Sequence, residues 1–244
     1  MDPSEPKDTR LRKGRNHQNE ISMSLKAILF DLDGTLLDTL ADLADAANRV
    51  LAGAGLPTHG RDAYRRFIGD GSRMLITRAL PAHQREPQTI DAMLTAFKAD
   101  YGRHWKTATC PYPGIRELLD ELVRRHIPRA VVTNKPQPFA EGSLAHFFPD
   151  AGFAIVRGQH GTRPIKPHPA PALEAAARLG VAPPECLLLG DSGVDMQTAR
   201  AAGMLPIGAA WGFRSVDELT ENGAAGIVFS PLEVLEWFDR GGAP

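Results

Sequence analysis

The spacing of hydrophobic residues along the chain predicts a buried strand followed by several helices. An apolar run over residues 25–31 has the length of a strand covered on both faces. From residue 39 to residue 54, apolar side chains recur at helical spacing. The same spacing predicts further helices near 60–68, 72–80 and 88–105. The chain from residue 41 to 109 therefore holds several helices and no convincing strand.

After residue 112 the pattern changes to an alternation of helices and strands. Helices are predicted over 114–126, 137–146, 169–179, 194–202 and 231–239. Strands are predicted over 128–133, 153–156, 186–190, 204–208 and 226–229. Alternating units of this length are typical of a parallel sheet with helices on both faces. We therefore expect an α/β protein with a Rossmann-like core of three layers, αβα.

The first helical stretch is too long to be one crossover between two strands of this sheet. It is better interpreted as an inserted helical cap domain, with hinges near 38–41 and 109–113. The expected division is a tail or upstream extension over 1–24, a core over 25–40 and 110–244, and a cap over 41–109.

Composition and charge narrow the class of protein. The formal net charge is −1, which gives no support for nucleic-acid binding. No apolar run reaches transmembrane length, and residues 1–24 lack the apolar stretch of a secretory signal. The two cysteines, Cys110 and Cys186, have no metal-ligand spacing, and Cys186 is expected to be a buried free thiol. We expect a cytoplasmic protein, monomeric or homodimeric, that does not bind membranes.

The candidate chemistry begins at the end of the first strand, with Asp31 and Asp33. Residues two apart in an extended chain point to the same side, so both carboxylates can face one pocket. Two such acids repel each other unless a cation or a proton lies between them. The pair therefore indicates divalent-metal or acid–base chemistry, although an ordinary turn would use the same residues.

Other polar residues follow the later strands, and the carboxyl ends of parallel strands share one edge of the sheet. The strand over 128–133 delivers Thr133 and Asn134, and the strand over 186–190 delivers Asp191 and Ser192. We expect these side chains to share one site with Asp195, one turn further on, and with Lys166, which is followed by prolines at 167 and 169. A purely structural role, as the acid at a helix start, stays open for Asp195.

These residues fall into four motifs, in order: Asp31-Leu32-Asp33-Gly34-Thr35, Val132-Thr133-Asn134, Lys166-Pro167, and Gly190-Asp191-Ser192 followed by Asp195. Over about residues 25–240 the chain resembles the haloacid dehalogenase superfamily of phosphohydrolases, whose first-type cap is inserted at the same place. The stretches Thr133-Asn134-Lys135-Pro136 and Lys166-Pro167-His168-Pro169 look most like bacterial phosphoglycolate phosphatases. Ala170, where close relatives often carry an acid, departs from that pattern.

The resemblance implies a role for each motif residue. Asp31 would be the nucleophile that forms an aspartyl-phosphate, and Asp33 the general acid and then the general base. Thr133 and Lys166 would bind the phosphate oxygens. Asp31, Asp191 and the backbone carbonyl of Asp33 would hold Mg²⁺. Asn134, Ser192 and Asp195 would support these groups from behind, with Asp195 orienting Lys166 or a metal-bound water.

The cap supplies weaker candidates around the turn Gly69-Asp70-Gly71. Arg66, Asp70 and Arg73, with Ser72, could reach over the pocket, and an arginine there could pair with a substrate carboxylate. A solvated cap surface explains each of them equally well. Lys135 is interpreted as a charge at the rim of the site.

The expected activity is that of a Mg²⁺-dependent phosphomonoesterase acting on a small phosphorylated metabolite, with 2-phosphoglycolate the leading substrate by resemblance. A pyrophosphatase, a sugar-phosphate phosphatase and a phosphoglucomutase-like transferase remain alternatives within the same superfamily. A protein that binds phospholigands without turnover is the alternative from another class, and the intact set of motif residues counts against it.

Overall fold

The computed structural model describes residues 24–240. The expected tail over 1–24 therefore lies, apart from Ser24, outside the described residues. No helix in the described part of the chain is both long and apolar enough to cross a membrane.

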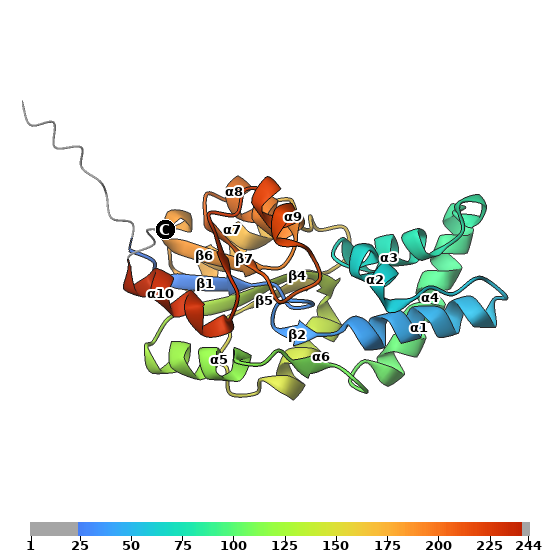
Figure 1. Cartoon of the computed structure of the whole chain (residues 1–244), viewed down its shortest axis with the longest axis horizontal. Helices are drawn as coiled ribbons and strands as arrows, with labels where there is room; N and C mark the ends of the chain where they lie inside the picture. The colour runs from blue at the N-terminus through green and yellow to red at the C-terminus, as the bar shows by residue number, and fades with distance from the viewer. Residues whose placement is uncertain (1–23, 241–244) are drawn as a thin grey trace, which may run out of the picture.

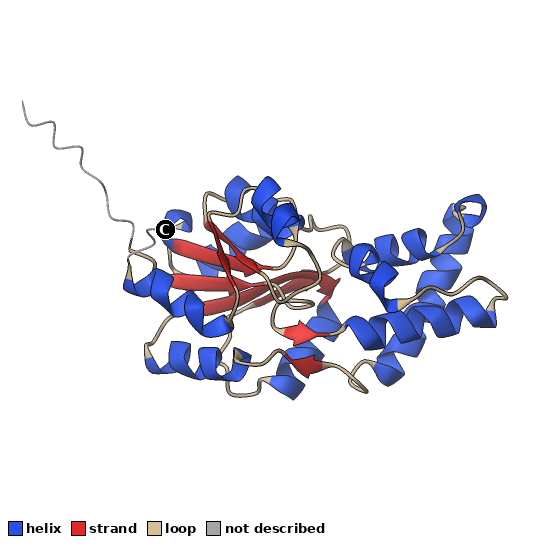
Figure 2. Cartoon of the chain, viewed as in Figure 1, coloured by secondary structure: helices blue, strands red, loops and turns tan. Residues whose placement is uncertain are grey.

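The core is a six-stranded, wholly parallel sheet in the order β5-β4-β1-β6-β7-β8, which confirms the expected α/β class. Its strands are β1 (Ala27–Phe30), β4 (Arg129–Pro136), β5 (Val156–Gln159), β6 (Cys186–Gly190), β7 (Leu205–Ala209) and β8 (Gly226–Val228). Figure 2 shows this sheet in the middle of the core. β1 lies between β4 and β6, where the order of strands along the chain reverses. Ligands in open parallel sheets bind at such a switch point, beyond the carboxyl ends of the strands.

Helices cover both faces of the sheet because successive strand residues point to opposite sides. Ile28 and Phe30 pack with α5 (Ile115–Arg124), α6 (Gln137–Phe147) and α10 (Val234–Asp239). Ala27 and Leu29 pack instead with α7 (Ala170–Leu179) and α8 (Gly193–Ala201). In Figure 1 these two sets lie below and above the sheet. The three-layer αβα arrangement is thus confirmed, and α9 (Val216–Glu221) is an additional short helix between β7 and β8.

The stretch after β1 forms a separate helical body at one end of the sheet (Figure 1). It consists of α1 (Leu40–Gly53), α2 (Arg61–Phe67), α3 (Gly71–Ala79) and α4 (Pro87–His104). These helices enclose a hydrophobic cluster of their own, which includes Leu51, Tyr64, Ile76 and Phe97. We refer to this body as the cap.

The chain crosses between core and cap at one short ribbon that the hydrophobic pattern did not predict. β2 (Leu37–Asp38) pairs antiparallel with β3 (Cys110–Pro111). The buried carboxylate of Asp42, in the first turn of α1, accepts hydrogen bonds from the backbone N–H groups of Ala108 and Thr109 and from the Thr109 hydroxyl. The two crossings are therefore held together by side-chain as well as backbone bonds.

Most predicted elements agree with the observed ones within two residues, and three do not. β4 ends at Pro136, three residues beyond the predicted strand, and α10 begins at Val234, three residues after the predicted start of that helix. The strand expected over 153–156 is observed at Val156–Gln159, so the prediction is displaced by three residues. Phe153, which suggested that strand, packs its ring against Phe30 from the preceding loop. Cys186 is fully buried and unpaired, as expected.

Candidate active site

The loop after β1 holds Asp31 and Asp33 at the edge of the sheet. The backbone N–H of Asp31 donates to the carbonyl of Leu189 on β6, which fixes where β1 ends. Gly34 then has φ +90°, and a Cβ there would lie 2.3 Å from an Asp191 carboxylate oxygen. Only glycine satisfies both requirements, the left-handed backbone and the close approach. The turn thus brings the first-strand acids against Asp191.

Lys166 lies between two of the predicted site acids. Its ammonium is 2.8 Å from Oδ1 of Asp31 and 2.6 Å from Oδ1 of Asp195, and all three side chains are buried. Burial alone would lower the pKa of Lys166, but the carboxylates of Asp195 and Asp31 raise it above its ordinary value. Lys166 is therefore a permanent positive charge beside Asp31.

Asp195 combines the two roles considered for it. Besides pairing with Lys166, it accepts hydrogen bonds from the backbone N–H and the hydroxyl of Ser192, at 3.1 Å and 2.6 Å. It thus belongs to a capping box at the start of α8. Its oxygens are engaged by Lys166 and Ser192, and neither Asp195 nor Ser192 is among the described residues that line the pocket.

Asp191 is fixed by two donors, one on each oxygen. The Thr35 hydroxyl donates to Oδ1 at 3.0 Å, and the backbone N–H of Phe213 donates to Oδ2 at 2.8 Å. Burial and then the charges of Asp31 and Asp195 raise the pKa of Asp191 to about 8. Burial likewise raises the pKa of Asp31 to about 6, despite the nearby Lys166.

The acids form a group that can hold a hard metal ion. One carboxylate oxygen from each of Asp31, Asp191 and Asp195 lies within 4.8 Å of the others. All donors in this group are oxygens, which Mg²⁺ and Ca²⁺ prefer. Burial and the mutual repulsion of these acids raise the pKa of Asp31 and Asp191, and a divalent cation between them would stabilise both carboxylates in the charged form. The residues present therefore fit a divalent metal.

Asp33 faces away from this group, towards Lys135 and the cap. The Lys135 ammonium is 2.7 Å from Oδ1 of Asp33 and donates at 2.9 Å to the hydroxyl of Tyr101 on α4. The expectation that Lys135 is a rim charge is wrong, because its side chain is 3% exposed. Since the Asp33 carboxylate is engaged there, a metal contact of Asp33 would have to come from its backbone carbonyl.

Thr133 and Asn134 close the remaining side of the site. Thr133 lines the pocket, and its hydroxyl accepts a hydrogen bond from the backbone N–H of Lys135. The Asn134 side chain forms no hydrogen bond with Asp31 or Asp33 in the described structure. It bonds instead with the backbone N–H and carbonyl of Lys166, and with the carbonyl of Gly69 in the cap. Asn134 thus positions Lys166 and the cap turn rather than Asp31.

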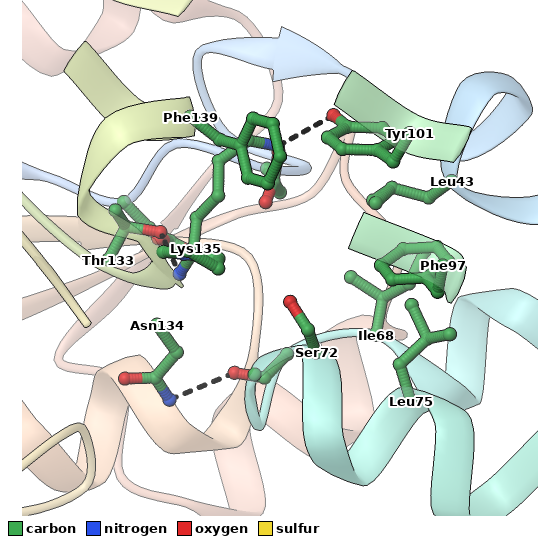
Figure 3. A pocket seen from close by; sticks show the side chains of 15 residues that line it. Leu43, Ile68, Ser72, Leu75, Phe97, Tyr101, Thr133, Asn134, Lys135 and Phe139 are labelled. Carbon is green, nitrogen blue, oxygen red and sulfur yellow. Dashed lines mark hydrogen bonds and ion pairs between the residues drawn. The ribbon is translucent and has the colours of Figure 1, made fainter. Parts of the chain in front are cut away.

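A pocket lies between core and cap, above these residues. Its floor is polar and includes Asp31, Asp33, Thr133, Asn134 and Lys135, whereas its cap wall is mostly apolar. Figure 3 shows this wall, to which Leu43, Ile68, Leu75, Phe97 and Tyr101 contribute. Ser72 adds one hydroxyl from the cap. Among the described lining residues, Lys135 is the one basic side chain.

The three cap residues expected to bind substrate do not line this pocket. Arg73 pairs with Asp91 on the exposed surface of the cap, and Arg66 is exposed. Asp70 pairs with Arg78 at 2.5 Å and lines a neighbouring hollow that also reaches Lys166. The glycine turn itself does reach the pocket, through Gly69, Gly71 and Ser72.

Sequence reasoning missed three contributors to the site. Thr35 stood inside a quoted motif without a role, and Lys135, beside Asn134, was interpreted as a rim charge, although both could have been assigned from their neighbours. The segment from Trp211 to Arg214 follows β7 and gave no signal of its own. Its contact with Asp191 depends on tertiary packing alone.

Comparisons with known proteins agree with this site. Residues 28–209 match the family of haloacid dehalogenase-like hydrolases. A phosphoglycolate phosphatase of Photorhabdus laumondii is 32% identical over 197 residues, which cover 80% of this chain and 84% of the relative. An N-acetylmuramic acid 6-phosphate phosphatase of Pseudomonas aeruginosa is 33% identical over 220 residues, which cover 89% of this chain and 96% of the relative.

Solved structures show the same architecture. A crystal structure from Lactobacillus delbrueckii subsp. bulgaricus, provisionally named a phosphoglycolate phosphatase, superimposes with a TM-score of 0.83 at 32% identity. The match covers 88% of this chain and 99% of that one. The site and these likenesses agree: the chain belongs to the haloacid dehalogenase-like hydrolase family and is a phosphatase of the phosphoglycolate phosphatase-like kind.

Proposed function

We propose that the protein is a Mg²⁺-dependent phosphomonoesterase that works through an aspartyl-phosphate on Asp31. The observation that carries this proposal is that the two acids of the loop after β1 have different surroundings. Asp31 lies beside Lys166 and Asp191, whereas Asp33 lies on the pocket side next to Lys135. One carboxylate is thus placed for attack beside positive charge, and the other for proton transfer.

The reaction proceeds in two steps. A carboxylate oxygen of Asp31 attacks phosphorus, the bond from phosphorus to the ester oxygen breaks, and Asp33 gives its proton to the departing alcohol. Asp33 then takes a proton from water as that water attacks the aspartyl-phosphate, which releases phosphate and restores Asp31. Lys166 and Thr133 bind the phosphate oxygens. Asp31, Asp191 and the backbone carbonyl of Asp33 would hold Mg²⁺, which would reduce the repulsion between Asp31 and the phosphate.

The cap supplies the rest of the pocket and separates the reaction from water. We propose that residues 41–109 form a mobile cap domain on the core of residues 25–40 and 110–244. The separate hydrophobic cluster of the cap and the single β2–β3 ribbon support this division.

The leading substrate is 2-phosphoglycolate, hydrolysed to glycolate and phosphate. The support is the name shared by several curated relatives at 32–34% identity. A glycolate carboxylate needs a cationic partner, and Lys135 is the basic side chain that the described lining offers.

A sugar phosphate is the second candidate, and two observations favour it. The cap wall brings apolar side chains and no basic one among the described residues. The relative that this chain matches along 96% of the relative's length is named an N-acetylmuramic acid 6-phosphate phosphatase.

The chemistry is tested by phosphate release from p-nitrophenyl phosphate, with Mg²⁺ or with EDTA. We expect activity with Mg²⁺ alone, and a loss of at least about 10³-fold in Asp31→Asn. Asp120→Asn, an exposed acid on α5, is the matched control and should keep full activity. Equal turnover in Asp31→Asn would refute the nucleophile assignment, and the absence of turnover on any ester would favour a binding protein.

The substrate is tested with a panel of 2-phosphoglycolate, pyrophosphate, β-glucose 1-phosphate and sugar 6-phosphates with and without N-acetyl groups. The highest kcat/KM on 2-phosphoglycolate supports the leading candidate. The highest value on a sugar 6-phosphate supports the second. Preference for pyrophosphate, or transfer of phosphate between positions of glucose, would support the remaining alternatives.

A further inference from the structure

The segment from Trp211 to Arg214, here the 211–214 segment, has no role in the mechanism above. It follows β7 and passes between the metal-binding acids and the cap. Two of its residues are packed against the core. The Trp211 indole N–H donates at 3.0 Å to the carbonyl of Thr35, and a Cβ at Gly212 would lie 2.2 Å from the Cβ of Asp191.

The same segment holds the Asp191 carboxylate directly. The backbone N–H of Phe213 donates to Oδ2 of Asp191 at 2.8 Å. The Phe213 side chain packs instead into the hydrophobic cluster of the cap. One residue thus contacts an acid of the core with its backbone and the cap interior with its ring.

Arg214 completes the connection to the cap. Its guanidinium donates to the carbonyls of Arg65, Arg66 and Ile68, at the end of α2. Side chains with positive charge are favourable at a helix C-terminus, where carbonyls lack helical partners. Arg214 is a core residue, so these hydrogen bonds fix the end of a cap helix to the core.

Glu218 on α9 holds Arg214 from the core side. Its carboxylate lies 3.4 Å from Nε of Arg214 and accepts a hydrogen bond at 3.2 Å from the backbone N–H of Gly193. Gly193 is the first residue of α8, two residues beyond Asp191. Arg214 is therefore connected to the Asp191 loop by two routes, through Phe213 and through Glu218.

We propose that Arg214 is a positioning residue that couples the closed position of the cap to the geometry of Asp191. Metal binding at Asp191 and docking of α2 then stabilise each other. By thermodynamic linkage, each strengthens the other by the same factor. This inference rests on the proposed metal-dependent function, since it concerns the same acids.

The test measures both directions of this coupling without turnover. Hydrogen exchange of peptides covering residues 61–68 is followed with and without saturating Mg²⁺, and Mg²⁺ affinity is measured by calorimetry. In the wild type, Mg²⁺ should slow exchange of this segment by about fivefold or more. In Arg214→Gln, the slowing should disappear, and Mg²⁺ should bind about fivefold or more weakly.

Arg85→Gln is the matched control. Arg85 also donates to carbonyls at a helix end, those of Arg78 and Leu80, but both lie within the cap. Its loss removes the same kind of bonds without breaking a core–cap contact. It should therefore leave Mg²⁺ affinity and the Mg²⁺-induced slowing unchanged. Arg214→Lys, which keeps the charge but cannot donate in several fixed directions, should fall between wild type and Arg214→Gln.

The outcomes separate this proposal from the proposed function. Unchanged Mg²⁺ affinity in Arg214→Gln and Arg214→Lys would overturn the coupling. Hydrogen exchange of residues 61–68 that is equally fast with and without Mg²⁺ in the wild type would overturn it as well. If the wild type shows the coupling but releases phosphate from no ester, the coupling stands and the proposed activity fails.

Discussion

The ammonium of Lys135 lies 2.7 Å from Oδ1 of Asp33, inside the boundary between core and cap. Its second partner, the Tyr101 hydroxyl, belongs to α4 of the cap. Burial alone would lower the pKa of Lys135, but Asp33 and Tyr101 raise it, so the side chain stays charged. The proposed general acid is therefore held by a permanent cation that also contacts the cap.

Replacing Lys135 by methionine should impair both stability and turnover. The change leaves the Asp33 carboxylate, whose side chain is 12% exposed, without its partner, and breaking a buried ion pair costs up to about 3–5 kcal/mol. The loss of a correctly held general acid should lower kcat by about 10²-fold. Urea denaturation and p-nitrophenyl phosphate turnover measure the two effects. Lys98→Met, at an exposed position of α4, should change stability by less than about 0.5 kcal/mol.

Replacing Thr35 by valine should weaken metal binding. Valine keeps the shape of threonine but removes the hydroxyl that donates to Asp191. Groups that orient a metal ligand contribute about 10–100-fold to metal affinity, and calorimetry with Mg²⁺ measures the loss. Thr39→Val is the matched control, since the Thr39 hydroxyl is buried and has no hydrogen-bond partner in the described structure. Equal Mg²⁺ affinity in the two variants would contradict the role of Thr35.

The metal-free protein should lose stability as the pH rises from about 4 to about 8. The folded-state pKa of Asp31 is raised to about 6 and that of Asp191 to about 8, so the folded protein binds more protons than the unfolded chain. This contribution is complete below the unfolded pKa of about 4 and is lost as the pH passes each raised value. A fall of several kcal/mol in the free energy of unfolding is expected in urea denaturation with EDTA.

Two controls identify the groups responsible for that pH dependence. Mg²⁺ binds the ionised carboxylates, so saturating Mg²⁺ should flatten or reverse the fall. Asp191→Asn removes the titrating group with the higher pKa and should flatten the curve above pH 6 in EDTA. A slope that is the same in Asp191→Asn as in the wild type would show that other groups produce it.

Replacing Asp42 by asparagine should destabilise the protein at the crossing between core and cap. The carboxylate accepts bonds from two backbone N–H groups and the Thr109 hydroxyl, and asparagine has one acceptor oxygen in its place. A loss of about 1.5–3 kcal/mol is expected in urea denaturation. Asp45→Asn, on the same helix, breaks only the exposed pair with Arg61 and should cost less than about 1 kcal/mol.

The core of the fold and the floor of the site could be predicted from the sequence because both follow from local pattern. Apolar runs of strand length and helical spacing indicate the elements, and the carboxyl ends of parallel strands bring Asp31, Thr133 and Asp191 to one edge. Lys166 was predictable from the family motif and its proline-rich loop. The structure brings all four together, and their catalytic roles stay predictions.

The parts that were not predicted depend on side-chain direction and on contacts across domains. Asp33 and Lys135 meet because both point to the cap, and two-residue periodicity does not reveal that. Arg66 and Arg73 were plausible from their closeness to a glycine turn, yet neither guanidinium lines the pocket. The β2–β3 ribbon is too short for any periodicity to be seen.

That ribbon has a consequence for how such enzymes diversify. Leu37 pairs with Pro111 and Asp38 with Cys110, so the chain leaves the core and returns to it on adjacent strands. The whole stretch of chain between β2 and β3 therefore takes the place of the loop of a β-hairpin. An insertion of any length can occupy this place if its ends lie one strand spacing apart. Substrate preference can then change by exchange of a whole module, while the acids at the sheet edge keep their positions.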